Sequence, residues 1–143
     1  MGATFEPPAW LAISAHLYRR VLNRQAVSLT KALRKRGCTL QVKQAMDAVH
    51  AAYHRCDGLD PYDGTPLQGE HLEEILPGAN RTSGADLHRR WDALPTVAQV
   101  QSDAGIVVEI VSRRTWAAKG DRTAEEYLEH CRAVVAWVDR RGG

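Results

Sequence analysis

The N-terminal third of the chain carries a repeating pattern of apolar residues that is typical of amphipathic helices. Over residues 9–23, apolar side chains recur every three or four positions, as Trp10, Ile13, Leu17, Tyr18, Val21 and Leu22. A second, short helix is predicted over residues 28–36, ending before Gly37 with the basic cluster Lys31, Arg34, Lys35 and Arg36. A third helix is predicted over residues 39–54, with Thr39 as its cap.

The pattern changes in the middle of the chain, where turn-forming residues become frequent. Residues 56–67 are rich in Asp, Gly and Pro, which predicts a loop. A short acidic helix is predicted over residues 70–76, a second loop over residues 77–84, and another short helix over residues 86–94.

The C-terminal third predicts a β-hairpin followed by two helices. Strands are expected over residues 96–100 and 106–111, the latter being the strongest β signal in the chain, and a short helix over residues 113–119. Thr123 and Glu126 form a capping box for a last helix that extends to about Asp139. We expect this helix to bury a stripe formed by Leu128, Cys131, Val134, Val135 and Val138.

These elements predict an α+β fold, mostly helical, in which N-terminal helices pack with a C-terminal hairpin–helix unit. We expect a helical region over residues 1–56 and a hairpin–helix region over residues 57–143, forming one compact domain. The length of 143 residues and the 44% hydrophobic content fit a single buried core. No apolar run is long enough to span a bilayer, no export signal begins the chain, and the three cysteines form no CxxC pair. A cytoplasmic protein with no membrane partner is therefore expected.

The formal net charge of +2 conceals an uneven distribution along the chain. Residues 1–58 carry nine Lys or Arg against three Asp or Glu, a net charge of +6, and residues 59–94 carry three against seven, a net charge of −4. Residues 95–143 carry seven of each sign. A basic first third favours contact with phosphates or with an acidic partner, although solvated helix faces explain the same charges equally well.

Four segments of the chain, in order, resemble one branch of the HNH endonucleases, the family with the ββα-metal or His-Me finger fold. Residues 57–67, DGLDPYDGTPL, are similar to its "DG-x-D-P/Y-Y-T-G-E-P-L" segment, and residues 94–100, LPTVAQV, to its "L-P-T-V-D-H-V". Residues 111–121, VSRRTWAAKGD, resemble its "C-x-W-R-T-N-D-A-K-N-D", and residues 125–132, EEYLEHCR, its "E-E-F-x-x-L-C-R". The resemblance implies a hairpin and helix that grip one divalent cation, and it covers none of residues 1–50.

The residues that carry the chemistry of that family are replaced in this chain. The positions of the metal-binding Asp, the general-base His and the metal-binding helix residue hold Ala98, Gln99 and Trp116. An alanine offers no ligand, a glutamine takes no proton at neutral pH, and an indole offers only an N–H donor. The resemblance therefore implies a scaffold whose catalytic and metal sites are degenerate, with no metal and no cofactor expected.

Binding without catalysis is then the expected function, with the candidate contact residues Arg34, Lys35, Arg36, Arg113, Arg114, Trp116 and Lys119. A protein partner is slightly favoured, because Trp116 beside Arg113 and Arg114 has the composition of an interface hot spot and because the acidic middle weakens attraction to DNA. An inhibitor, immunity or anti-defence role, as in genes of phage and mobile elements, is consistent with this. For Arg114 and Lys119, contact with phosphate and a structural ion pair remain equal alternatives.

The main alternative is a nucleic-acid-binding HNH endonuclease. It would be active through substitute residues, or it would be an engineered inactive form of a metal-dependent enzyme that uses Mg²⁺ or another divalent cation. His50 and His54, four positions apart on a predicted helix, favour a solvated helix face over a metal site. Trp10, Trp91 and Trp137 are expected to pack, whereas Trp116 is expected to be accessible. The oligomeric state is left open.

Overall fold

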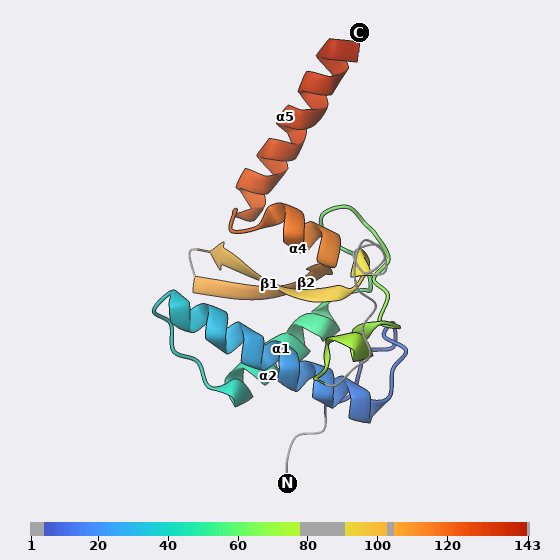
Figure 1. The fold of residues 1–143 in the computed structure, drawn as a ribbon, viewed down its shortest axis with the longest axis vertical. Helices are drawn as coiled ribbons and strands as arrows, with labels where there is room; N and C mark the ends of the chain where they lie inside the picture. Colours follow the sequence, from blue (N-terminus) through green and yellow to red (C-terminus); the bar gives the residue numbers. More distant parts are fainter. Residues whose placement is uncertain (1–4, 78–90, 103–104, 143) are drawn as a thin grey trace.

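The computed structural model of the chain describes residues 5–77, 91–102 and 105–142, and it has an α+β architecture (Figure 1). Its elements, in chain order, are α1 (Ala15–Lys35), α2 (Val42–Arg55), the 3₁₀ helix η1 (Leu72–Ile75), β1 (Pro95–Ser102), β2 (Gly105–Ser112), α4 (Arg113–Lys119) and α5 (Ala124–Gly142). Figure 1 shows α1 and α2 on one side of the hairpin, α4 on the other side, and α5 extending away from both. None of the described helices combines the length and the hydrophobicity needed to cross a membrane.

One long helix, α1, replaces the two helices predicted over residues 9–23 and 28–36, so the predicted break between them is wrong. The helix starts after Ser14, whose Oγ accepts a hydrogen bond from the Leu17 amide at 3.1 Å. It continues to Lys35 because this stretch contains no Gly or Pro to interrupt it. Gly37, with φ +82°, follows its end as predicted.

Helices α1 and α2 form most of the core by packing their apolar faces together. α2 begins at Val42 rather than near Thr39, and the Gln44 side chain accepts a hydrogen bond from the Gln41 amide at 3.1 Å. The residues buried between the helices and the hairpin include Tyr18, Val21, Leu22, Ala26, Leu29, Leu33, Ala45, Val49, Ala52, Tyr53, Val108 and Ile110. The N-terminal helices therefore pack directly on the hairpin.

Polar side chains also join the helices to the hairpin. The Tyr53 hydroxyl donates to Gln25 Oε1 at 2.8 Å, and Gln25 Nε2 donates to the carbonyl of Pro95 at 3.3 Å. On the other strand, Arg55 donates to the carbonyl of Val108 at 3.0 Å. Each strand is thus attached to a different helix.

The predicted hairpin is confirmed, and each of its strands is longer than expected. β1 and β2 pair antiparallel from Pro95↔Ser112 to Ser102↔Gly105. Within this register Gln99 lies opposite the buried Val108, on the face covered by α1 and α2. Ala98 lies opposite Glu109 on the other face, since successive side chains of a strand point to opposite faces. Positions 98 and 99 therefore point to different sides of the sheet.

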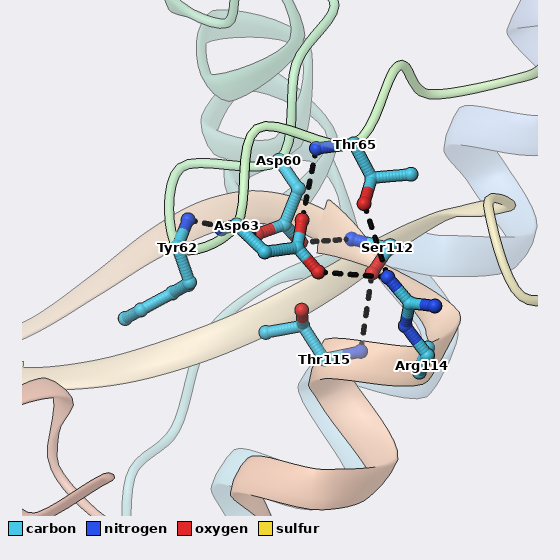
Figure 2. A network of polar contacts seen from close by, with 7 residues as sticks. All are labelled: Asp60, Tyr62, Asp63, Thr65, Ser112, Arg114 and Thr115. Carbon is cyan, nitrogen blue, oxygen red and sulfur yellow. Dashed lines mark hydrogen bonds and ion pairs between the residues drawn. The ribbon is translucent and has the colours of Figure 1, made fainter. Parts of the chain in front are cut away.

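The loop over residues 56–67 is confirmed as well, and it fixes the start of α4. Asp60 is 2% exposed; its Oδ2 accepts from the Ser112 amide at 2.7 Å, and its Oδ1 accepts from the amides of Tyr62 and Asp63 at 2.7 and 3.0 Å. Ser112 Oγ in turn accepts from the Thr115 amide at 3.1 Å and caps α4. Figure 2 shows these bonds converging where β2 meets α4.

The segment before the hairpin is described only in part. The acidic helix predicted over residues 70–76 is a shorter 3₁₀ helix, η1, over Leu72–Ile75. All but the first residue of the loop predicted over residues 77–84, and most of the helix predicted over residues 86–94, lie outside the described residues.

The last helix, α5, is where the sequence prediction fails most clearly. Its capping box is confirmed, because the Thr123 and Glu126 backbone amides donate to each other's side chains at 3.1 Å, and the helix continues to Gly142. The predicted buried stripe is wrong, because no residue of α5 is buried and the exposed side chains include Leu128, Val134, Val135 and Val138. The expected packing of Trp137 is wrong as well, since this side chain is exposed. Periodicity identifies an apolar face, but it does not show whether another segment covers that face.

Candidate functional site

The three residues that the resemblance to HNH endonucleases singles out, Ala98, Gln99 and Trp116, lie around one cavity. This cavity has a volume of about 690 Å³ and lies between α1, the β1 strand and α4. Ala98 and Gln99 line it from β1, and Trp116 lines it from α4. Its other described lining residues are Ser28, Lys31, Ala32, Lys35, Arg36, Val97, Ala117, Lys119, Gly120, Asp121, Arg122 and Thr123.

A second cavity, of about 370 Å³, adjoins the first. The two have five lining residues in common, which are Ser28, Ala32, Val97, Gln99 and Trp116. Arg24, Gln25, Trp91 and Arg113 are among the residues that line only the second. We refer to the two cavities together as the basic groove.

Cationic side chains dominate the basic groove. Among the described residues that line it, the cationic ones are Arg24, Lys31, Lys35, Arg36, Arg113, Lys119 and Arg122. The one carboxylate among them is that of Asp121. Asp121 forms an ion pair with Arg36 at 3.2 Å. Lys31 and Lys35 have no carboxylate within ion-pair distance among the described parts of the chain, and both side chains are exposed. The groove therefore presents uncompensated positive charge to the solvent.

Trp116 and Arg113 form a stacked pair in the groove. The Arg113 guanidinium lies 4.5 Å from the centre of the Trp116 ring and 5.8 Å from that of Trp91. Burial lowers the pKa of Arg113, but the guanidinium stays protonated at neutral pH because its ordinary pKa is so high. Trp116 is 42% exposed, which agrees with the expected accessibility.

Ala98, Gln99 and the other described residues of this cavity do not fit a divalent cation. Ala98 has no donor atom and is 5% exposed. Gln99 Oε1 is buried, without a hydrogen-bond partner among the described residues, and it supplies one neutral oxygen. Asp121 is the single carboxylate on the described lining, and hard cations such as Mg²⁺ prefer several oxygen ligands. No group of three or more His, Cys, Asp or Glu in the described part of the chain is placed to hold a metal.

Arg114 and Lys119 both have partners within the protein. Arg114 donates to Asp63 Oδ2 at 3.0 Å and to Thr65 Oγ1 at 3.1 Å, on the loop shown in Figure 2. Burial works to raise the pKa of Asp63, but hydrogen bonds from Thr65 and Arg114 outweigh it and hold that pKa below its ordinary value. Lys119 is 3% exposed, and its Nζ donates to the Arg122 carbonyl at 2.6 Å. These geometries favour structural roles over phosphate contact.

The remaining candidate residues, at the end of α1, differ in whether they line the groove. Lys35 and Arg36 line the basic groove, whereas Arg34 is exposed on the same helix and lines neither cavity. Arg24 and Lys31 were not among the contact residues predicted from the sequence, although Lys31 belongs to the predicted basic cluster. A signal was present, because Arg24, Lys31 and Lys35 are spaced by seven and four residues and so share one helix face.

The two histidines of α2 are held by groups other than a metal. His50 Nδ1 lies 2.7 Å from the Tyr18 hydroxyl, and His54 Nε2 lies 2.7 Å from the Glu6 carbonyl. Their rings meet edge to face, with centroids 4.5 Å apart. Through these hydrogen bonds, both histidines help to hold α1, α2 and the N-terminal segment together.

Comparisons with known proteins identify no relative of this chain. No protein-family model, no curated protein and no solved structure matches the chain.

Proposed function

We propose that this protein binds nucleic acid in the basic groove and does not cleave it by metal-dependent hydrolysis. The observation that carries the proposal is the set of seven cations around two adjoining cavities. Two of them are already used within the protein, since Lys119 is buried and Arg36 is paired with Asp121, the single carboxylate among the described lining residues. Phosphate backbones are the ligands to which such a surface is complementary, because each neutralised phosphate releases counterions.

The placement of the cations on α1 favours an extended anion over a point charge. Arg24, Lys31 and Lys35 share one helix face over eleven residues, which correspond to about 16 Å at a rise of 1.5 Å per residue. A strand of nucleic acid presents several phosphates over that length. A single phosphate or carboxylate would engage only one end of this row.

Trp116 supplies the second kind of contact that nucleic-acid grooves use. Its indole is 42% exposed and lies in the middle of the groove, since it lines both cavities. Aromatic side chains next to a cationic track stack on bases without regard to sequence. We therefore expect single-stranded nucleic acid to bind more tightly than duplex.

The absence of cleavage follows from the side chains at the degenerate positions. Neither Ala98, Gln99 nor Trp116 provides a carboxylate ligand or a group that takes a proton near neutral pH. The chain should thus bind without nicking, in contrast to the HNH endonucleases that it resembles. An active enzyme using substitute residues remains the alternative, and so does an engineered inactive form of one.

A protein partner is the second candidate function. The stacking of Arg113 on the exposed Trp116, at 4.5 Å, gives this part of the groove the composition of an interface hot spot. An inhibitor, immunity or anti-defence role would use this pair, while Arg114 would contribute little because it is committed to Asp63.

The decisive experiment compares two charge reversals on neighbouring residues. Lys35→Glu and Arg34→Glu change the net charge equally, on the same helix turn, but only Lys35 lines the groove. Fluorescence anisotropy with a labelled single-stranded oligonucleotide and its duplex should show that Lys35→Glu weakens binding about tenfold or more and lowers the salt slope by roughly one. Arg34→Glu should change the Kd less than about threefold, through the long-range field alone. Circular dichroism checks that both variants fold.

The same preparation can refute the proposal in three ways. Equal losses in the two variants would mean that binding is diffuse, and no binding at low salt would exclude nucleic acid as the ligand. Nicking of a plasmid by the unaltered chain with Mg²⁺, Mn²⁺ or Ni²⁺ would contradict the absence of hydrolysis. Cleavage only by Ala98→Asp/Gln99→His/Trp116→Asn would agree with a degenerate nuclease scaffold.

A further inference from the structure

The side-chain amide of Gln99, in the wall of the basic groove, has a hydrogen-bonding atom that the described parts of the chain leave unused. Its Oε1 is buried and accepts no hydrogen bond from any described residue. Such an atom is uncommon in folded proteins, because it loses its bonds to water and gains none in return. Gln99 as a whole is half-buried and lines both cavities. The last torsion of a glutamine side chain has broad preferences, so the oxygen can turn toward a ligand in either cavity.

The two cavities of the groove differ in the side chains that line them. The larger, of about 690 Å³, has most of the cations, including Lys31, Lys35 and Arg122. The smaller, of about 370 Å³, is lined mainly by apolar and aromatic side chains, which include Leu29, Ile75, Trp91, Leu94, Val97 and Trp116. Apolar walls with a few polar groups are typical of pockets that bind a small organic ring. The larger cavity therefore suits a phosphate backbone, and the smaller one suits a base.

The polar groups of the smaller cavity indicate which bases it favours. The Gln25 amide is bonded at both its oxygen and its nitrogen within the core, and the Thr96 hydroxyl donates to the Leu94 carbonyl at 2.9 Å. The cations that line this cavity are hydrogen-bond donors only. Among its described side chains, the buried oxygen without a bond is that of Gln99, and an acceptor selects a ligand that presents a donor. Adenine and cytosine present an exocyclic amino group, whereas thymine and uracil carry a carbonyl oxygen there.

We propose that the smaller cavity takes one base of a bound single strand and that Gln99 Oε1 accepts a hydrogen bond from the exocyclic amino group of that base. The groove then favours adenine and cytosine over thymine and uracil. This inference rests on the proposed function, and it adds a base preference to it. Stacking on Trp116, which lines both cavities, is indifferent to the identity of the base, so the preference comes from Gln99.

Removing the amino group from the ligand tests this inference on the unaltered full chain. Fluorescence anisotropy at low salt compares two short labelled single strands, one with adenine at every position and the other with unsubstituted purine, which is adenine without its amino group. The adenine strand should bind about three- to tenfold more tightly, the range expected for one net hydrogen bond.

A variant of the protein assigns that difference to Gln99. Gln99→Met keeps the length of the side chain and removes the amide, so this variant should bind both strands with the affinity that the unaltered chain has for the purine strand. The matched control Gln68→Met makes the same substitution at an exposed position that lines neither cavity, and it should keep the full preference. Circular dichroism checks that both variants fold.

The results separate a failure of this inference from a failure of the proposed function. Equal binding of the two strands by the unaltered chain would overturn the role of Gln99 and leave nucleic-acid binding in place. A preference that Gln99→Met retains would overturn it too, because another group would then recognise the amino group. No binding of either strand would overturn the proposed function and this inference with it. A preference lost in Gln99→Met and kept in Gln68→Met would support both.

Discussion

Replacing Asp60 by Ala is expected to destabilise the protein more than any other single substitution in the loop over residues 56–67. The carboxylate is 2% exposed and accepts three backbone hydrogen bonds, from Ser112, Tyr62 and Asp63. Alanine removes all three at once. It also separates this loop from the end of β2, where Ser112 starts α4 (Figure 2).

The size of the effect depends on which amides water can reach after the substitution. Ser112 is fully buried, so its amide would be left without a partner at a cost of about 1–3 kcal/mol. The amides of Tyr62 and Asp63 lie in an accessible loop and can bind water, so each lost bond to the carboxylate costs about 1 kcal/mol. The sum is about 3–5 kcal/mol. For a chain of this length it corresponds to a fall in Tm of roughly 10–20 °C.

Chemical denaturation and differential scanning calorimetry measure both quantities. The matched control is Asp57→Ala, the same substitution at an exposed position of the same loop, for which we expect a change within about 0.5 kcal/mol. If Asp60→Ala costs less than 1 kcal/mol more than this control, the view that the buried carboxylate organises the junction between the loop and α4 is refuted.

Two further predictions concern the packing of α2 and of the N-terminal segment. Burial lowers the pKa of His50 below its ordinary value of 6.5, so the unfolded chain binds the proton more readily and the free energy of unfolding should fall as the pH drops through about 6.5. An NMR titration that gives His50 a pKa at or above 6.5 would contradict this. Gly58→Ala should cost about 1–3 kcal/mol, because Gly58 has φ +87° and an added Cβ would lie 3.1 Å from the Trp10 side chain. The control is Gly64→Ala, because Gly64 has φ +74° but open space around it, so the substitution adds backbone strain without a contact. Equal losses of unfolding free energy in the two variants would mean that the contact with Trp10 is unimportant.

The parts of the fold that the sequence predicts correctly are those set by local interactions. The Ser112 cap of α4 and the capping box of Thr123 and Glu126 each join residues three positions apart, and the two strands of the hairpin are neighbours in the sequence. The break predicted inside α1 fails because a gap in the apolar pattern does not end a helix that lacks Gly or Pro. The burial of α5 fails for a different reason, since burial depends on a partner surface that no local pattern describes.

In the candidate site, too, the sequence predicts some features, whereas others depend on residues far away along the chain. The resemblance to HNH endonucleases selected Ala98, Gln99 and Trp116, and these do line one cavity. The role of Arg114 could not be decided from the sequence, because its partner Asp63 is 51 residues away along the chain. Whether a cation on α1 faces the groove depends on how α1 is rotated against β1, which the sequence alone leaves open.

The buried bonds from Tyr53 to Gln25 and from Gln25 to Pro95 settle that rotation. A hydrogen bond inside the core is made in one alignment only, because a buried polar group left without a partner is costly. A rotation of α1 by a single residue, about 100°, would break both bonds and would carry Lys31 and Lys35 away from the hairpin. The side-chain amide of Gln25 therefore fixes the rotation of α1 relative to the hairpin. It carries no charge itself, yet it determines which charges of the first helix the groove presents.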